Sequence, residues 1–268
     1  ERDRTMTADT LIELGRAGTR MEHVPIIDMH AHIHISSFGV WESAPAGIVE
    51  GMDRVGVTMT LITASAPVSE RDAEQANTEV LEATEHFPGR LRAYFRVWPT
   101  AESVTYTEAE QEIDRGFIGV KLYNNILPYD HPCYEPYLAV ANEQRRPVLF
   151  HTWGQQEDLD AIRAIAQQCP ETSLLAGHAG SANEAAYVKL AQDCANVYLD
   201  LTLSASPRGL VKRFVEQVGA DRLVWGSDAA LFSQAQQLGK VLGAEISEED
   251  KIKILSGNAR RILDRVMP

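Results

Sequence analysis

The sequence has few cysteines, and it lacks any long apolar run. Three cysteines occur in 268 residues, and no two of them form a Cys-x-x-Cys pair. This scarcity argues against a disulfide framework and predicts a protein of the reducing cytoplasm. No stretch reaches the ~20 consecutive apolar residues of a membrane-spanning helix, so we expect no membrane partner.

Basic residues are also in short supply. Lysine and arginine number 25 against 38 acidic residues, which gives a formal net charge of −13. A chain without a basic excess has little to displace counterions from a polyanion, which argues against nucleic acid as a partner. No Gly-x-Gly-x-x-Gly follows a strand-like run, so a Rossmann dinucleotide site has no support. We therefore expect a small-molecule substrate.

Short apolar runs alternate with amphipathic stretches along the chain. The apolar runs are not polar at alternate positions, which is typical of strands covered on both faces. The predicted strands are Ile26–Met29, Met59–Thr63, Leu91–Val97, Gly119–Tyr123, Val148–His151, Ser173–Ala176, Val197–Leu201 and Leu223–Trp225. The predicted helices are Glu70–His86, Tyr106–Arg115, Cys133–Gln144, Gln155–Gln168, Ala182–Asp193, Arg208–Val218, Leu231–Leu242, a helix opened by Ser247, and Ala259–Val266 after a break at Gly257-Asn258.

This alternation predicts an α/β fold, a (β/α)8 TIM barrel in a single domain. A doubly wound open sheet is the second interpretation. We place the barrel at residues 26–268, after an N-terminal extension over residues 1–25 that carries an extra helix near Thr7–Arg16. A homodimer is the base-rate expectation for the assembly.

Residues of metal-binding type stand at the ends of the predicted strands. His30 and His32 end the first strand, and side chains two apart on a strand point to the same side. His151 ends the fifth strand, His178 follows the sixth, and Asp228 follows the eighth. In a barrel the carboxyl ends of all strands meet at one rim, where the active site lies. The pattern predicts a metal site at that rim.

The sequence resembles the amidohydrolase superfamily, and most closely its amidohydrolase-2-type branch. The resemblance runs from Ile26 to Leu263. The motifs that carry it are Ile27-Asp28-Met29-His30-Ala31-His32, residues 116–122, residues 146–152, Gly177-His178-Ala179-Gly180, residues 197–200, Trp225-Gly226-Ser227-Asp228 and Gly257-Asn258-Ala259. One departure is Ala230, where many relatives have proline.

The resemblance implies a role for each residue at the rim. His30, His32, His151 and Asp228 would bind one divalent metal, with zinc the expected ion. Asp228 would also take a proton from the attacking water. His178 would stay off the metal and polarise the substrate carbonyl or shuttle protons.

Lys121 and several loop residues are further candidates. In binuclear relatives a lysine on the fourth strand is carbamylated and bridges two metals, whereas we favour one metal with Lys121 as a free amine that binds substrate. His131, Trp153 and Tyr123 follow strands four and five and are candidate substrate contacts. His34 is more simply a loop residue than a further ligand.

The superfamily pattern is compatible with more than one reaction. We favour a metal-dependent hydrolase that cleaves a small amide, ester or lactone through a metal-activated water. The alternative is a non-oxidative decarboxylase of an aromatic or unsaturated acid, which would need an arginine at the rim; Arg96 and Arg208 are the candidates. A non-catalytic barrel is a third interpretation, but it predicts a damaged ligand set.

Overall fold

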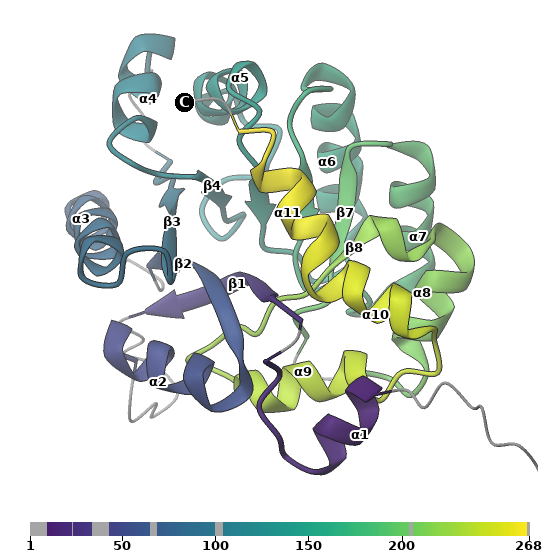
Figure 1. The fold of residues 1–268 in the computed structure, drawn as a ribbon. Helices are drawn as coiled ribbons and strands as arrows, with labels where there is room; N and C mark the ends of the chain where they lie inside the picture. The colour runs from purple at the N-terminus through teal and green to yellow at the C-terminus, as the bar shows by residue number, and fades with distance from the viewer. Residues whose placement is uncertain are drawn as a thin grey trace, which may run out of the picture.

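The structure is a computed structural model in which residues 10–22, 24–33, 43–64, 69–99, 104–203 and 206–266 are described. Eight parallel strands in the order β1 to β8 form the centre, with helices packed around them (Figure 1). The predicted (β/α)8 barrel is confirmed, and each predicted strand matches an observed one. The strands are β1 Ile26–Ile33, β2 Val57–Ala64, β3 Leu91–Arg96, β4 Gly119–Leu122, β5 Val148–Phe150, β6 Leu174–Ala176, β7 Val197–Asp200 and β8 Leu223–Val224.

The barrel is closed by contacts between the residues after β8 and strand β1. The Met29 amide donates to the Trp225 carbonyl at 3.0 Å, and the Asp228 amide donates to the His30 carbonyl at 2.8 Å. Ala31 and Ala229 form a parallel bridge beyond these bonds. Sequence neighbours of Asp228 are thereby fixed against His30, although almost 200 residues separate them.

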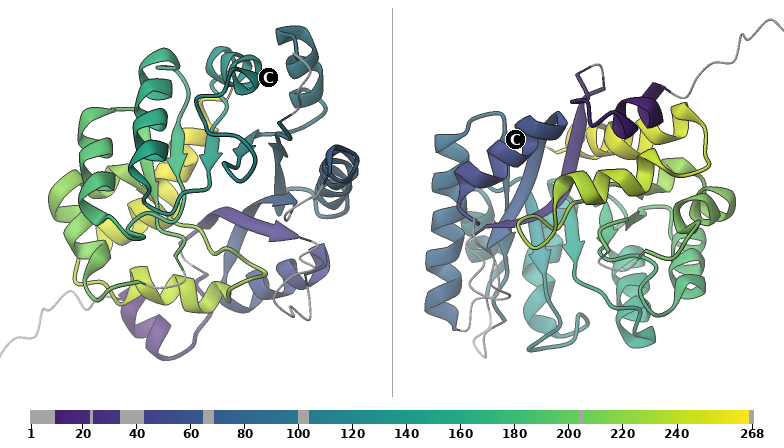
Figure 2. Two further views of the ribbon diagram at one scale, coloured as in Figure 1. Left: turned by 180° about the vertical axis from the view of Figure 1, so that it is seen from behind. Right: turned by 90° about the horizontal axis from the view of Figure 1, so that it is seen from below.

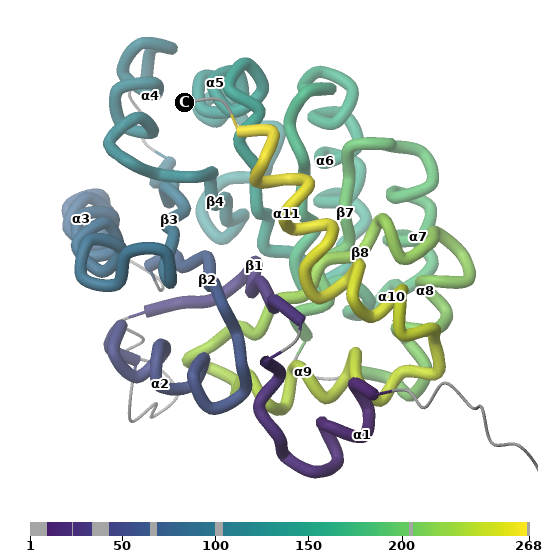
Figure 3. Tube along the Cα trace, viewed as in Figure 1, coloured from purple at the N-terminus to yellow at the C-terminus, as the bar shows by residue number. Residues whose placement is uncertain are grey.

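The helices that lie between successive strands follow one another around the barrel in chain order, whereas the last helical segment crosses one end of it, as the tube in Figure 3 traces. Most lie where the sequence predicts them, and α3 has the predicted bounds. The helix before β2 was not predicted. The helices are α1 Thr10–Arg16, α2 Pro45–Val55, α3 Glu70–His86, α4 Tyr106–Ile113, α5 Glu135–Glu143, α6 Gln156–Gln168, α7 Glu184–Asp193, α8 Leu210–Val218, α9 Gln234–Leu242, α10 Glu248–Ile252 and α11 Asn258–Leu263.

The predicted break at Gly257-Asn258 is wrong. Lys253–Gly257 forms a π-helical turn that joins α10 to α11 without interruption. The Asn258 side-chain amide donates to the carbonyls of Ala220 and Leu223 at 2.7 and 2.6 Å. These tertiary bonds give the asparagine a helical position that its intrinsic preference would not predict.

Helix α1 confirms helical structure within the predicted N-terminal segment, whose residues 7–9 lie outside the described part. It packs against α9, and both views in Figure 2 show the two side by side. Leu11 is the buried residue of α1. No helix in the described ranges is long and apolar enough to cross a bilayer.

The inner face of the barrel has an apolar layer with a polar layer above it. Leu61, Tyr94, Leu149 and Tyr198 belong to one buried cluster, which Ala259 and Ile262 of α11 join. Side chains alternate along a strand, so the residues two positions further on face inward as well. Those residues are Thr63, Arg96, His151 and Asp200. The apolar layer thus fills the amino-terminal half of the barrel, and the polar layer lies at the carboxyl ends of the strands.

Candidate active site

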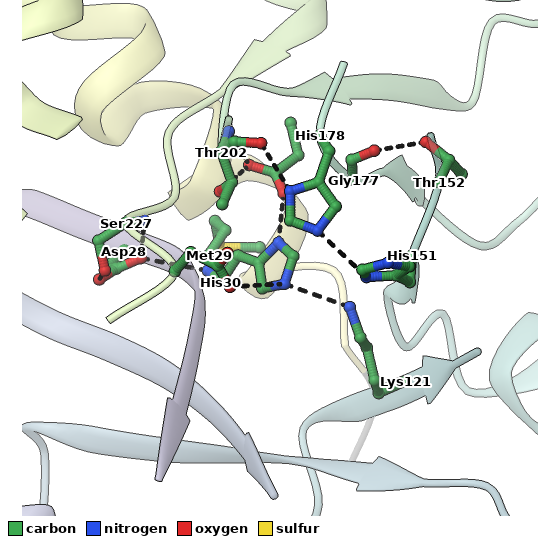
Figure 4. A network of polar contacts seen from close by, with 12 residues as sticks. Asp28, Met29, His30, Lys121, His151, Thr152, Gly177, His178, Thr202 and Ser227 are labelled. Atoms are coloured by element: carbon green, nitrogen blue, oxygen red, sulfur yellow. Dashed lines mark hydrogen bonds and ion pairs between the residues drawn. The ribbon is translucent and has the colours of Figure 1, made fainter. Parts of the chain in front are cut away.

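The strand-end residues singled out from the sequence meet in the polar layer of the barrel. Figure 4 shows His30, Lys121, His151 and His178 pointing toward one another. His30 Nε2 lies 3.7 Å from Asp228 Oδ1, and His32 Nε2 lies 3.1 Å from the same oxygen. His30, His178 and Asp228 each offer one ligand atom, and these three atoms lie within 4.8 Å of one another. All four side chains are buried. Residues from strands at opposite ends of the sequence therefore share one small site.

His30 is oriented by a carboxylate that sequence analysis missed. His30 Nδ1 and Asp200 Oδ2 are 2.6 Å apart, and both side chains are fully buried. The other Asp200 oxygen accepts from the Thr202 amide at 3.1 Å and from its hydroxyl at 2.7 Å. We assign the Nδ1 proton to His30, because this leaves its Nε2 lone pair facing the site. Asp200 ends β7, so the strand-end rule that found His151 also identifies it.

Asp28 on β1 connects this strand to the segment after β8 through hydrogen bonds. Its carboxylate accepts from the Ser227 amide at 2.9 Å, from the Ser227 hydroxyl at 2.5 Å and from the His30 amide at 3.2 Å. Ser227 precedes Asp228, whose φ of 56° is in the left-handed region. His178 also has a φ of 56°. Such backbone costs an L-residue roughly 1–3 kcal/mol and is concentrated at functional sites.

His178 and His151 form a second hydrogen-bonded chain. His178 Nδ1 lies 2.8 Å from the Thr202 carbonyl, and His178 Nε2 lies 3.1 Å from His151 Nδ1. Because a carbonyl only accepts, His178 carries its proton on Nδ1, and its Nε2 accepts from His151. This assignment leaves Nε2 of His151 as a free lone pair. By distance, His178 belongs with His30 and Asp228 as a possible metal ligand. Both of its ring nitrogens are hydrogen-bonded, however, so His151, with a free Nε2 lone pair, is better able to bind a metal ion.

Two basic side chains, Lys121 and Arg96, lie in the same layer. Lys121 Nζ is 3.2 Å from His30 Nε2, and the side chain is fully buried. The Arg96 guanidinium lies 4.1 Å from the centroid of the Tyr123 ring, and its Nε has no hydrogen-bond partner in the described part of the chain. Arg208, the other arginine considered, is exposed just before α8. Only Arg96 of the two lies in the barrel.

The aromatic candidates line one side of the site. Tyr123 stacks on His151 with a centroid distance of 4.3 Å, and Trp153 stacks on His178 at 4.9 Å. His131 has a structural task, since its Nδ1 accepts from the Cys133 amide at the start of a short 3-10 turn. His34 lies outside the described residues.

Burial sets the charge state of the imidazoles. It lowers the pKa of His30 well below its usual value, and the nearby Lys121 lowers it further. Burial likewise lowers the pKa values of His32, His151 and His178. The histidines are therefore neutral near pH 7, which is the form that binds metal.

The acids and the lysine are shifted as well. Burial would raise the pKa of Asp228, but the neighbouring imidazoles of His32, His30 and His178 together lower it, so Asp228 is a carboxylate. Burial raises the pKa of Asp200 against the opposing bonds from Thr202. Burial lowers the pKa of Lys121 to about 7, which makes the neutral amine accessible.

The residues present fit a divalent metal ion. Imidazole nitrogens and a carboxylate oxygen are the donor set of first-row divalent ions. Asp228 Oδ1 is buried close to the Nε2 atoms of His30 and His32 but makes no well-formed hydrogen bond in the described ranges. An anionic oxygen placed in this way beside neutral imidazoles is accounted for by a cation that all three groups bind. The Asp200 carboxylate behind His30 is the supporting contact usual for a metal-binding histidine.

Comparison with known proteins places the chain in a family. A family model described as amidohydrolase matches residues 27–265. The chain belongs to the amidohydrolase family. No curated protein matches significantly. This membership confirms the resemblance found in the sequence, and it means that the barrel belongs to a family of enzymes.

Solved structures with the same fold include both decarboxylases and a hydrolase. The 2,6-dihydroxybenzoate decarboxylase from Rhizobium is 16% identical, with a TM-score of 0.73 over 91% of this chain and 99% of that one. The 5-carboxyvanillate decarboxylase from Novosphingobium aromaticivorans, complexed with manganese and a nitrobenzoic acid, is 15% identical, with a TM-score of 0.69 and coverage of 90% and 96%. A probable 2-pyrone-4,6-dicarboxylic acid hydrolase from Acinetobacter baumannii is 16% identical, with a TM-score of 0.66 and coverage of 89% and 99%. At these identities the likeness shows the fold alone.

Proposed function

We propose that the protein is a metal-dependent hydrolase that cleaves a small ester, amide or lactone. The observation that carries the proposal is the Asp228 carboxylate, which stays anionic beside His30 and His32 and has one oxygen without a hydrogen-bond partner in the described part of the chain. The lowered pKa keeps Asp228 deprotonated at neutral pH, which is the form that is able to accept a proton from water. The same shift makes Asp228 a poor donor of a proton to carbon.

We propose that one divalent ion is held by His30, His32, His151 and Asp228, with zinc as the expected ion and manganese as an alternative. When bound, the ion lowers the pKa of a coordinated water toward neutrality and polarises the substrate carbonyl. His151 would contribute Nε2, since its Nδ1 is directed at His178.

The residues of the chain then divide the remaining tasks. Asp228 accepts the proton of the attacking water on its free oxygen. Asp200 keeps the His30 ring in one orientation through the 2.6 Å contact at Nδ1. His178, held by the Thr202 carbonyl, lies within reach of the leaving group as a proton carrier. Lys121 places an amine beside His30 that can donate a hydrogen bond to a substrate oxygen.

Decarboxylation of an aromatic or unsaturated acid is the second candidate, and Arg96 favours it. This guanidinium is 2% exposed, and its Nε lacks a hydrogen-bond partner among the described residues, as expected of a site for a carboxylate. Two of the solved structures described above are decarboxylases of substituted benzoates by name, and one is a hydrolase of a dicarboxylic acid. All three names contain an acid, so a carboxylate on the substrate suits either reaction.

One assay separates the two reactions. Protein loaded with Zn²⁺ or Mn²⁺ is incubated with panels of lactones, esters, amides and aromatic acids, and hydrolysis and carbon dioxide release are both measured. We expect hydrolysis that Asp228→Asn reduces by about 10²-fold or more, as for loss of a general base. Carbon dioxide release without hydrolysis would replace the first proposal with the second. Hydrolysis that persists in Asp228→Asn would remove Asp228 from its proposed role.

A further inference from the structure

The loops that carry His151 and His178 are joined by side chains beyond the point where the sheet ends. Among the described residues, the last backbone hydrogen bond between the ends of β5 and β6 runs from the Gly177 amide to the Phe150 carbonyl at 2.9 Å. The next link is the Thr152 hydroxyl, which donates to the Gly177 carbonyl (Figure 4). Thr152 directly follows His151, and Gly177 directly precedes His178. The relative position of the two imidazoles therefore depends on this side-chain bond as well as on the sheet.

The phenol of Tyr187, on α7, holds the Thr152 hydroxyl in place. The Tyr187 side chain is fully buried, and its oxygen lies 2.6 Å from Thr152 Oγ1. A threonine hydroxyl has one proton, and Thr152 gives it to the Gly177 carbonyl, so Tyr187 is the donor to Thr152. Burial raises the pKa of Tyr187, so the phenol keeps the proton that this bond requires. These groups form one directed chain from α7 to the residue before His178.

The same phenol oxygen also contacts the rest of both loops. It accepts a hydrogen bond from the Gly154 amide, and Ser181 Oγ lies 3.5 Å from it. The Ser181 hydroxyl in turn donates to the His178 carbonyl. Gly154 has a φ of 81°, and a Cβ there would lie 2.2 Å from the Ser181 carbonyl oxygen, so the two loops approach closely at a point that requires glycine. Tyr187 thus lies where the loop after β5 meets the loop after β6.

The loop after β6 depends on such support because its backbone is strained. His178 and Ala182 have φ values of 56° and 50°, in the left-handed region that residues with a Cβ avoid. Backbone of this kind persists only where the surrounding structure holds it. His178 Nε2 lies 3.1 Å from His151 Nδ1, and a small shift of either loop would break that hydrogen bond.

We infer that Tyr187 is a positioning residue whose hydroxyl, acting through Thr152, holds the two imidazoles at hydrogen-bonding distance. The inference rests on the proposed function, in which His151 is a metal ligand. The bond to His178 keeps the proton of His151 on Nδ1 and leaves Nε2 free for the ion. Without the phenol hydroxyl, the Gly154 amide loses its acceptor and Thr152 loses its donor, and the loops are free to separate. His151 then carries its proton on either nitrogen, and the form protonated on Nε2 cannot bind the ion through that atom.

The tautomer of His151 in the metal-free protein tests the inference without metal or turnover. In protein labelled at histidine with the NMR-active nitrogen isotope, long-range proton–nitrogen spectra show which ring nitrogen carries the proton. We expect His151 of wild type to be protonated on Nδ1 alone, and Tyr187→Phe to lose this single tautomer. Thr152→Val, which removes the hydroxyl in the middle of the chain, should have the same effect, whereas Thr152→Ser should keep the wild-type signal.

Competition for Zn²⁺ with a chelating dye gives a second measurement. We expect Tyr187→Phe and Thr152→Val each to weaken metal binding by about 10-fold, as for the loss of a group that orients a ligand. Because both residues act in one chain, the double variant should bind about as tightly as either single variant. Tyr106→Phe is the matched control, since the Tyr106 hydroxyl bonds Glu143 at 2.7 Å in an exposed contact between α4 and α5. It should change neither the tautomer nor the metal affinity.

The outcomes are separable from those of the proposed function. An unchanged His151 tautomer in both Tyr187→Phe and Thr152→Val would overturn the inference whatever the melting temperature, because a purely structural bond would lower stability alone. Two tautomers in wild type, or a Thr152→Ser variant that behaves like Thr152→Val, would also overturn it. If wild type binds no divalent ion, the proposed metal centre fails, while the tautomer still decides the role of Tyr187. If Tyr187→Phe does not fold, the two Thr152 variants decide.

Discussion

Replacing Asp200 with asparagine should weaken divalent-metal binding by about 10- to 100-fold, although Asp200 is not itself a proposed ligand. The carboxylate lies 2.6 Å from His30 Nδ1 in a fully buried pair. Asparagine keeps the shape but replaces a charged acceptor with a neutral one. The expected loss corresponds to about 1.4–2.7 kcal/mol of metal-binding free energy.

The position of Thr202 sharpens the expectation. Its amide and hydroxyl both donate to Asp200 Oδ1, so the asparagine must place its carbonyl oxygen there or face two donors with its amide group. In either orientation one of the two contacts, to His30 or to Thr202, is lost. Thr202→Val, which removes only the hydroxyl, should therefore weaken metal binding by a few-fold, as for one net hydrogen bond of about 1 kcal/mol.

The assay is competition for Mn²⁺ or Zn²⁺ between the metal-free protein and a chelating dye. Asp158→Asn is the matched control, because Asp158 is a buried acid that bonds Asn124 on the outside of the site. It should leave the metal affinity unchanged. An affinity of Asp200→Asn equal to wild type would refute the view that His30 binds metal through Nε2 with Asp200 behind it.

Two further predictions concern Lys121 and Gly226. Burial lowers the pKa of Lys121 from 10.5 to about 7, so the folded state binds fewer protons than the unfolded state between these values, and its stability falls as the pH drops from 10.5 to 7. In chelator, Lys121→Met should therefore stabilise the protein at pH 6 by up to about 5 kcal/mol and by much less at pH 9.5, as measured by urea unfolding; a difference independent of pH would contradict a buried free amine. At Gly226 a Cβ would lie 2.1 Å from Thr202 Oγ1 and 2.7 Å from His30 Cβ, so Gly226→Ala should abolish metal binding. The control is Gly239→Ala in α9, where a Cβ would meet open space. This substitution should leave the stability of the fold unchanged or raise it slightly. Metal retention by Gly226→Ala would show that the polar layer tolerates displacement.

The strands were predictable because each is a short apolar run in a barrel that covers both faces. Helix α2 was not, since Pro45 and two glycines give it a weak helical pattern, and packing on β2 and α9 stabilises it instead. The continuous turn through Gly257 was also hidden, because it depends on bonds from Asn258 to carbonyls 35 and 38 residues away.

The site residues that stand at the carboxyl ends of strands were predictable from the sequence. His30, His32, His151, His178 and Asp228 are brought together as the barrel topology requires. The orientation of each imidazole depends on hydrogen bonds between neighbouring strands, such as the bond from His178 to the Thr202 carbonyl. The spacing of residues along the sequence does not predict these bonds. The supporting acids Asp28 and Asp200 were within reach of the strand-end rule, but they lack the paired pattern that made His30 and His32 conspicuous.

The most direct test is elemental analysis of the purified protein with the metal content expressed per chain. We predict one divalent ion per chain in wild type and none in His30→Ala, with both proteins folded by circular dichroism. A folded wild-type protein that binds no divalent ion even when supplied with Zn²⁺ or Mn²⁺, or a His30→Ala variant that keeps its ion, would contradict the proposed metal centre.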